Sequence, residues 1–161
     1  MNIAIVAHDG RKQEMLEWVK YNYKSLAQHH IWATGTTGRL ISEISLTEEI
    51  DEYNHFVYQE VRPFENNVTC LLSGPLGGDQ QIGAMIAEGK IDILIFFCDN
   101  LIVQGHQNDV SALTRLASLY NIAFATNRTT ADFILTSTLI SDKNYERILP
   151  KAIENYKNRS L

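Results

Sequence analysis

The sequence predicts an α/β protein, namely a single-domain three-layer α/β/α sandwich with a mostly parallel five-stranded sheet. Short apolar runs alternate along the chain with longer segments of helical periodicity, and the run at 91–97 is almost continuously apolar. Alternating strands and helices are typical of parallel sheets, and a strand covered on both faces needs apolar residues along its length. Because 161 residues, 45% of them hydrophobic, can bury one core, residues 1–161 are expected to form one domain.

Each expected strand is a short apolar run, and each expected helix is a longer segment that separates one run from the next. The strands are predicted at 3–7, 31–33, 68–72, 91–97 and 122–125. The helices are predicted at about 10–27, 37–44, 79–89, 109–120, 129–136 and, in a polar C-terminal stretch, 143–158. Right-handed crossovers between the strands then decide which face of the sheet each helix covers.

One segment, 43–67, interrupts the alternation. Its charged residues are seven carboxylates and one arginine, Arg62. It also carries aromatic and apolar side chains. The carboxylates are Glu43, Glu48, Glu49, Asp51, Glu52, Glu60 and Glu65, and the apolar residues include Tyr53, Phe56, Val57, Tyr58 and Phe64. We interpret it as an exposed acidic excursion with a β-like run packed on the rim of the fold. The alternatives are a role in subunit contacts or in gating the site.

Composition excludes several classes of partner. The formal charge of −5 and the pI near 5.5, without a basic cluster, argue against nucleic acid or an anionic membrane as the main partner. No segment approaches the roughly 20 apolar residues of a membrane span, and the start lacks the basic leader of a secretory signal. Cys70 and Cys98 are expected to be buried free thiols. The protein is therefore predicted to be cytoplasmic.

Three strand-to-helix turns carry residues that suit an anion. They are Ala-His-Asp-Gly-Arg-Lys at 7–12, Ala-Thr-Gly-Thr-Thr-Gly at 33–38 and Ser-Gly-Pro-Leu-Gly-Gly-Asp-Gln-Gln at 73–81. Such turns converge at one edge of a parallel sheet, where helix N-termini offer unpaired N–H groups and positive dipole ends. Glycine lets the backbone approach a ligand, and Lys12 adds a positive charge. The turns therefore predict a phosphate site, with the Asp79 carboxylate beside it.

Further motifs extend over nearly the whole chain in one order. They are His8-Asp9 with Lys12, Thr34-Gly35-Thr36-Thr37-Gly38, Ser73-Gly74-Pro75 with Gly77-Gly78-Asp79-Gln80-Gln81, Gly89-Lys90-Ile91-Asp92 with Phe96-Phe97, and Ala125-Thr126-Asn127 with Thr130-Ala131-Asp132-Phe133. Together they resemble methylglyoxal synthase. The resemblance implies a carbon–oxygen lyase that converts dihydroxyacetone phosphate to methylglyoxal and inorganic phosphate without a cofactor or metal. It also implies a homo-oligomer, a hexamer, and makes 43–67 an insertion relative to the family.

The resemblance assigns the catalytic residues. Asp79 is expected to be the base that removes a carbon-bound proton, although an Asp at this position could instead cap its helix. His106, in a polar loop after the fourth strand, is implied as the electrophile that hydrogen-bonds the substrate oxygens and relays a proton. His8, at the end of the first strand, is implied as a substrate contact.

The phosphate cradle follows from the turns and from the resemblance alike. It consists of Lys12, Thr34, Gly35, Thr36, Thr37, Ser73 and Gly74. Helix capping is the alternative role for the two threonines of the helix start, and a solvated helix face is the alternative for Lys12. A lysine in a first helical turn opposes the helix dipole, so a bound anion would explain its placement.

Three carboxylates keep family positions in loops that depart from the family. Asp9, Asp99 and Asp109 are expected to orient histidines or to balance the charge of the site, with a surface or capping role as the alternative. The chain reads Cys98-Asp99-Asn100 and His106-Gln107-Asn108-Asp109 where the resemblance implies Trp-Asp-Pro and His-Asp-Pro-Asp. Because proline presets φ, its loss is expected to loosen the loop that presents His106.

Two other functions use parts of the same site. The fold also serves as a regulatory module, as in the effector domain of carbamoyl phosphate synthetase, which needs the cradle but not the acid and base. A phosphosugar isomerase would act through the same enediolate. The presence of both Asp79 and His106 in a free-standing chain favours the enzyme over the module, and product analysis separates the lyase from the isomerase.

Overall fold

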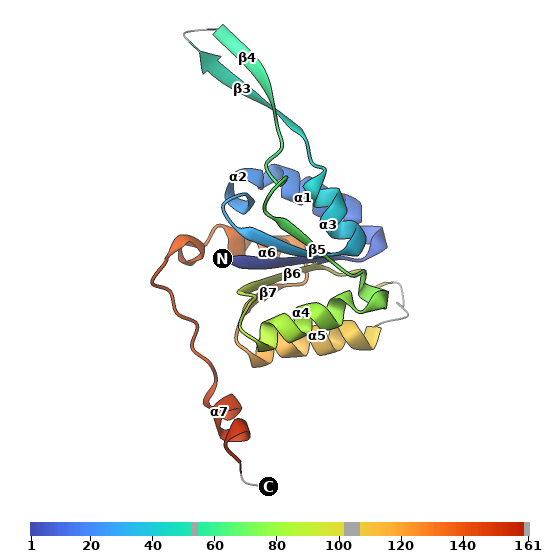
Figure 1. Cartoon of the computed structure of the whole chain (residues 1–161), viewed down its shortest axis with the longest axis vertical. Helices are drawn as coiled ribbons and strands as arrows, with labels where there is room; N and C mark the ends of the chain where they lie inside the picture. The colour runs from blue at the N-terminus through green and yellow to red at the C-terminus, as the bar shows by residue number, and fades with distance from the viewer. Residues whose placement is uncertain (53–54, 102–106, 160–161) are drawn as a thin grey trace.

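The chain folds around one parallel sheet with helices on both faces (Figure 1). A computed structural model describes residues 1–52, 55–101 and 107–159. The five parallel strands are β1 (Asn2–Ala7), β2 (His30–Thr34), β5 (Val68–Leu71), β6 (Ile93–Phe97) and β7 (Ala123–Ala125). Their order across the sheet is β5-β2-β1-β6-β7. The predicted five-stranded parallel sheet and three-layer arrangement are therefore confirmed.

The strand order reverses beside β1. The chain steps outward from β1 to β2 and β5, and then returns to place β6 against the other side of β1. In open α/β sheets this reversal opens a crevice outside the carboxyl ends of the strands. The turns that follow β1, β2, β5 and β6 all lie at this edge, which positions the site.

One face of the sheet carries the N-terminal helices together with α6. The elements are η1 (Asp9–Arg11), α1 (Lys12–Tyr21), α2 (Tyr23–Leu26), α3 (Gly35–Ser42) and α6 (Arg128–Leu135). Met15 and Trp18 of α1 are fully buried against the sheet and against Leu135 of α6. The Trp18 indole N–H also donates to the Asp132 carboxylate of α6 at 2.6 Å, so α1 and α6 are fixed side by side.

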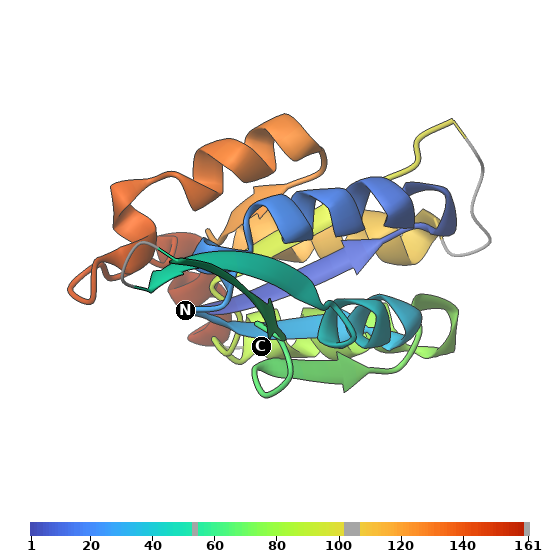
Figure 2. The same ribbon diagram turned by 90° about the horizontal axis from the view of Figure 1, so that it is seen from above.

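The opposite face carries α4 (Gly78–Ala87) and α5 (Gln107–Leu119), as Figures 1 and 2 show. Ile82 and Ile86 of α4 and Leu113 of α5 pack with Phe96 of β6 in a second apolar cluster. Because β6 has a buried cluster on each face, all five of its residues are buried. This accounts for the unbroken apolar run seen in the sequence.

Two predicted helices differ from the structure. The segment 10–27 is divided at Asn22, whose side-chain amide donates to the Trp18 carbonyl at 3.0 Å and competes with the helical bonding pattern. The C-terminal helix is confined to α7 (Lys151–Lys157). Pro150 precedes α7 with ψ of 132°, and the residue before a proline is itself disfavoured from helix, so the stretch ahead of it is irregular.

The acidic segment forms an antiparallel hairpin of β3 (Leu46–Glu52) and β4 (His55–Val61). Leu46, at its base, packs partly against the core, and Phe64, just after it, is fully buried. The rest of the hairpin projects beyond the helical layer (Figure 1). The β-like run was thus predicted, but it extends away from the rim instead of lying along it.

Both cysteines are free thiols with different surroundings. Cys98 is buried, and burial raises the pKa of its thiol to about 11. Cys70 is exposed on β5, an edge strand, so the expectation that it is buried was wrong. Among the described helices, none has the length and apolar character needed to cross a membrane.

Candidate active site

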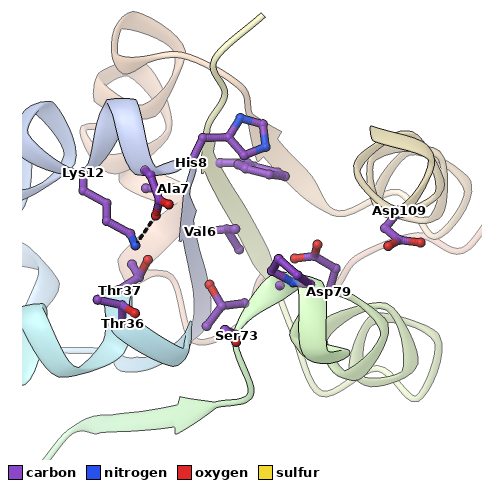
Figure 3. Close-up of a pocket in the computed structure, with 14 residues that line it drawn as sticks. Val6, Ala7, His8, Lys12, Thr36, Thr37, Ser73, Asp79 and Asp109 are labelled. Carbon is purple, nitrogen blue, oxygen red and sulfur yellow. Dashed lines mark hydrogen bonds and ion pairs between the residues drawn. The ribbon is translucent and has the colours of Figure 1, made fainter. Parts of the chain in front are cut away.

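A cavity of about 660 Å³ opens at the carboxyl edge of the sheet (Figure 3). Its walls come from the ends of β1, β2 and β6, from the turns that follow β1, β2 and β5, and from the starts of α4 and α5. The lining residues are Val6, Ala7, His8, Asp9, Lys12, Thr34, Thr36, Thr37, Ser73, Gly74, Pro75, Asp79, Phe96 and Asp109. Most of the residues predicted for the site therefore lie around one cavity.

The second and third turns are held directly against each other. The Gly35 N–H donates to the Leu72 carbonyl at 3.1 Å, and a Cβ on Gly35 would lie 2.8 Å from the Ser73 Cα. Gly35 also has a φ of 23°, which side chains other than glycine rarely adopt. Gly35 does not line the cavity, but it brings Thr36 and Ser73 into one wall of it.

Gly78, in the turn between β5 and α4, fixes the start of α4. The Gly78 N–H donates to the Ser73 carbonyl at 3.0 Å, and a Cβ there would lie only 2.0 Å from the Leu72 carbonyl oxygen. The side-chain amide of Gln81 accepts the Leu72 N–H through its oxygen at 2.9 Å. The turn between β5 and α4 is therefore closed on itself, which holds Asp79 at the cavity wall.

We expect Gly78→Ala to disrupt this turn. The new methyl group would collide with backbone atoms, which cannot rotate away as a side chain can. The free energy of unfolding should therefore fall by about 3 kcal/mol, and the midpoint of thermal unfolding by roughly 6–12 °C. Calorimetry measures the midpoint. Gly83→Ala, in the same helix, is the matched control, because among the described residues its Cβ would meet only the Leu116 side chain, at 3.1 Å. Equal midpoints for the two variants would contradict this role of Gly78.

Lys12 reaches into the cavity from the first turn of α1. Figure 3 shows its amine on the side of Thr36 and Thr37. The amine is paired with the Asp9 carboxylate at 2.5 Å, and the lysine side chain is 21% exposed whereas that of Asp9 is 95% exposed. The cation is thus held at the cavity by a carboxylate that lies almost wholly in solvent. An anion in the cavity would meet a lysine that is already in place.

Asp79 lies in the first turn of α4 and is only 2% exposed. The N-cap of α4 is Gly77, which has no side chain to cap the helix. In Figure 3 its carboxylate lies across the cavity from Lys12, with Ser73 between them. The carboxylate therefore faces the space in which a ligand held by the cradle would sit.

His8 ends β1 and is 5% exposed. The Asp99 backbone N–H donates to its Nδ1 at 2.8 Å, and the ring makes an edge contact with Phe96, with 4.9 Å between the ring centroids. Because Nδ1 accepts a bond, the neutral ring carries its proton on Nε2. His8 can thus donate a hydrogen bond through Nε2 while it remains neutral.

The three supporting carboxylates have different positions. Asp9 pairs with Lys12. Asp99 does not line the cavity. Its backbone N–H orients His8, whereas its carboxylate accepts the Leu101 N–H at 3.2 Å. Asp109 lines the cavity from α5 and lies farther out (Figure 3). His106 lies outside the described residues.

Four of the described cavity residues were not among the predicted site residues. Val6, Ala7 and Phe96 come from buried strands, and Pro75 belongs to η2 (Gly74–Leu76). These residues are apolar, and an apolar sequence pattern indicates only that a residue is buried. The same pattern is found in strands that line a cavity and in strands that do not. The Ser-Gly-Pro turn was the only local signal that could have found Pro75.

Comparison with known proteins assigns the chain to a family. The family model described as "MGS-like domain" matches residues 14–126. The methylglyoxal synthase of Proteus mirabilis strain HI4320 is 51% identical over 147 residues, which cover 91% of this chain and 84% of that protein. The chain belongs to the methylglyoxal synthase family. It is accordingly an enzyme and a lyase, as the sequence predicted.

Other methylglyoxal synthases agree with this assignment. The protein of Yersinia enterocolitica, serotype O:8, is 46% identical over 159 residues, covering 95% of this chain and 92% of that protein. The crystal structure of methylglyoxal synthase from Elizabethkingia anophelis NUHP1 aligns with a TM-score of 0.79 and 38% identity. It covers 99% of this chain and 91% of that one. The resemblance that the motifs indicated is therefore confirmed for the family and for the fold.

Proposed function

We propose that this cavity converts dihydroxyacetone phosphate to methylglyoxal and inorganic phosphate through an enediolate. The observation that carries the proposal is the pairing of a buried carboxylate, Asp79, with a held cation, Lys12, in one cavity at the starts of α1, α3 and α4. The cation and helix N-termini suit a phosphate dianion. The carboxylate suits removal of a proton beside a carbonyl.

The substrate phosphate would occupy the cradle of Lys12, Thr36, Thr37 and Ser73. Hydroxyls and backbone N–H groups would donate to its oxygens, and Lys12 would exchange part of its contact with Asp9 for the phosphate. Thr34, Gly35 and Gly74 complete the same two turns. With the phosphate fixed there, the carbon chain of the substrate would extend toward Asp79, on the far side of Ser73 (Figure 3).

The chemistry then proceeds in three steps that balance without added water. Asp79 takes a proton from the hydroxymethyl carbon, and the C–H electrons form a carbon–carbon double bond while the carbonyl oxygen becomes an enediolate oxygen. The hydroxyl on the former hydroxymethyl carbon then gives its proton to the leaving phosphate and becomes the aldehyde oxygen, the double bond shifts toward the methylene carbon, and the C–O bond to phosphate breaks. The product enolate takes up on its methylene carbon one proton, equivalent to the one that Asp79 holds, which gives methylglyoxal and returns Asp79 to its base form.

Donors must stabilise the negative charge on the enediolate oxygen. His8 can donate through Nε2, because Nδ1 is occupied by the Asp99 N–H. We propose that His8 contacts the substrate and that His106 supplies the electrophile and proton relay. Such donors are effective because they strengthen as charge develops in the transition state. Asp9, Asp99 and Asp109 are proposed to balance charge and to hold these groups in place.

Incubation of the purified protein with dihydroxyacetone phosphate tests this function. We expect methylglyoxal and inorganic phosphate in equal amounts, with the rate unchanged by a chelator, because no step above requires a metal. Activity that disappears with the chelator would require a different mechanism. Conversion to an aldose phosphate with no phosphate release would identify an isomerase instead.

Lys12→Ala should weaken substrate and phosphate binding together. A hydrogen bond to a charged group contributes about 1.5–3 kcal/mol, so both affinities should fall roughly 10- to 100-fold. Lys12 is the only lysine or arginine that lines the cavity within the described part of the chain. Substrate KM and inhibition by phosphate are the measurements. The control is Arg39→Ala, which removes an exposed cation on α3. If phosphate inhibits Lys12→Ala as strongly as the original protein, the anion binds elsewhere.

We further infer that the enzyme works as a homo-oligomer, which its resemblance to the family suggests is a hexamer. We also infer that inorganic phosphate, the product, binds in the same cradle as the phosphate of the substrate. Neither nucleic acid nor a membrane surface is proposed as a partner, given the formal charge of −5. A cytoplasmic location is proposed as well. The two free thiols support it, because reducing compartments keep cysteines unpaired.

A further inference from the structure

The β3–β4 hairpin presents an acidic aromatic face to solvent. Directly paired residues of an antiparallel ladder share a face, so Glu49 lies beside Tyr58 and Thr47 lies beside Glu60. All four are exposed, and Tyr58 is 71% exposed. Exposed aromatic rings are typical of surfaces that contact other proteins. Here the ring lies beside Glu49 and Glu60, and Glu60 also pairs with Arg62 of its own chain at 3.1 Å.

On the other face of the hairpin, β3 contacts its own chain, whereas Val57, which pairs with Ile50, is 45% exposed. Glu48 accepts a hydrogen bond from the Tyr23 hydroxyl and lies 3.9 Å from the Lys24 amine, both in α2. Leu46 and Ile50 on this face are half-buried. Beyond these contacts β3 and β4 pack mainly against each other. A two-stranded hairpin is marginally stable in water by itself, so a partner for the outward face would stabilise it.

The C-terminal segment 143–159, here called the C-terminal arm, has the complementary character. Its cations outnumber its two carboxylates, Glu146 and Glu154, and it exposes apolar side chains. The cations are Lys143, Arg147, Lys151, Lys157 and Arg159, and the exposed apolar residues are Tyr145, Ile148, Leu149 and Tyr156. Ile148 is 80% exposed, although its backbone is anchored where its carbonyl accepts a hydrogen bond from the Asn121 side chain. The arm is thus held in place while its apolar side chains remain uncovered.

The hairpin and the C-terminal arm lie at opposite ends of the longest axis of the molecule (Figure 1). They therefore cannot meet within one copy of the chain. Opposite charge and exposed apolar groups on both surfaces make them complementary between two copies. A contact between two different surfaces of identical chains is heterologous, and such contacts build rings when the rotation closes.

We propose that the outward face of the hairpin of one copy packs against the C-terminal arm of a second copy. Glu49 and Glu60 face Lys151 and Lys157 across this contact, and Tyr58 covers apolar side chains of the arm. The hairpin then serves as an assembly element, and none of its described residues lines the cavity. Because exposed charges contribute, high salt weakens the contact.

Zero-length carbodiimide cross-linking tests the contact on the unmodified chain. Ordinary and nitrogen-15-labelled protein are mixed, exchanged and cross-linked, and the peptides are identified by mass spectrometry. We expect peptides that join Glu49 or Glu60 to Lys151 or Lys157, with one member light and the other heavy. Cross-links of these carboxylates only within one copy, or only to lysines outside the arm, would overturn the proposal.

Charge reversal tests the same contact energetically. Glu49→Lys, and separately Lys151→Glu with Lys157→Glu, should each raise the dissociation constant of the oligomer roughly three- to tenfold. Combining all three substitutions should restore association, because each copy then carries both reversed surfaces. Sedimentation velocity over a dilution series gives the constants, and circular dichroism checks folding. Glu43→Lys, on an exposed residue outside both surfaces, is the control; no restoration in the combined variant would overturn the pairing.

Discussion

Asp79→Asn should lower turnover by roughly 10² to 10⁴-fold, the range that a general base contributes. The amide has nearly the shape of the carboxylate, so the closed turn between β5 and α4 is preserved. It cannot accept the proton from the substrate carbon. Because Lys12, Thr36 and Ser73 are unchanged, phosphate should bind with nearly its original affinity. Binding and chemistry should therefore separate at this one residue.

The measurement for Asp79→Asn is turnover together with inhibition by phosphate. Asp92→Asn is the matched control, because Asp92 lies at the opposite end of the sheet and accepts the Asn2 N–H at 2.8 Å, a bond that an amide oxygen can also accept. The control should retain its rate. If Asp79→Asn keeps more than about a tenth of the original turnover, far above what loss of a general base permits, Asp79 is not the base.

His106→Gln should lower turnover by roughly 10² to 10³-fold and leave phosphate affinity nearly intact. The imidazole is proposed to donate to the enediolate oxygen, whose charge exists mainly in the transition state, so the loss falls on kcat. Glutamine can still donate a hydrogen bond but cannot relay a proton. Steady-state kinetics with phosphate as a competing ligand separate the two effects.

The neighbouring loop provides the control for His106. If the absent prolines limit loop closure, Asn100→Pro or Asn108→Pro should raise turnover modestly in the original chain, and neither should restore the rate of His106→Gln. Full activity in His106→Gln would show that His106 is neither the electrophile nor the proton relay. His8 would then be the donor to test next, since its Nε2 proton is fixed by the Asp99 N–H at Nδ1.

Local sequence pattern was sufficient to predict the sheet and to predict that the three glycine-containing turns meet at one cavity. The five strands are short apolar runs that end in glycine-rich or polar turns, and parallel pairing carries those turns to one edge. Gly35 and Gly78 are glycines because backbone occupies the space of a side chain, a constraint that acts within the turn. The helix predictions failed where a local competitor acted, as with the side-chain amide of Asn22, which follows α1, and with Pro150 before α7.

Contacts between distant residues could not be predicted from the pattern. Asp99 was expected to act through its carboxylate, whereas its backbone N–H bonds His8, 91 positions away in the sequence. Phe96 and Val6 read as core residues, and only the strand order beside β1 reveals that they also line the cavity. Side-chain periodicity reports which residues are buried, but not what lies against them.

The fate of the phosphate oxygens in oxygen-18 water distinguishes elimination of phosphate from its hydrolysis. The enzyme is incubated with dihydroxyacetone phosphate in labelled water, and the released phosphate is examined by phosphorus NMR. Elimination through an enediolate breaks the C–O bond, so we predict unlabelled phosphate in an amount equal to methylglyoxal. Phosphate that carries one labelled oxygen, with dihydroxyacetone as the other product, would show hydrolysis at phosphorus and contradict the mechanism.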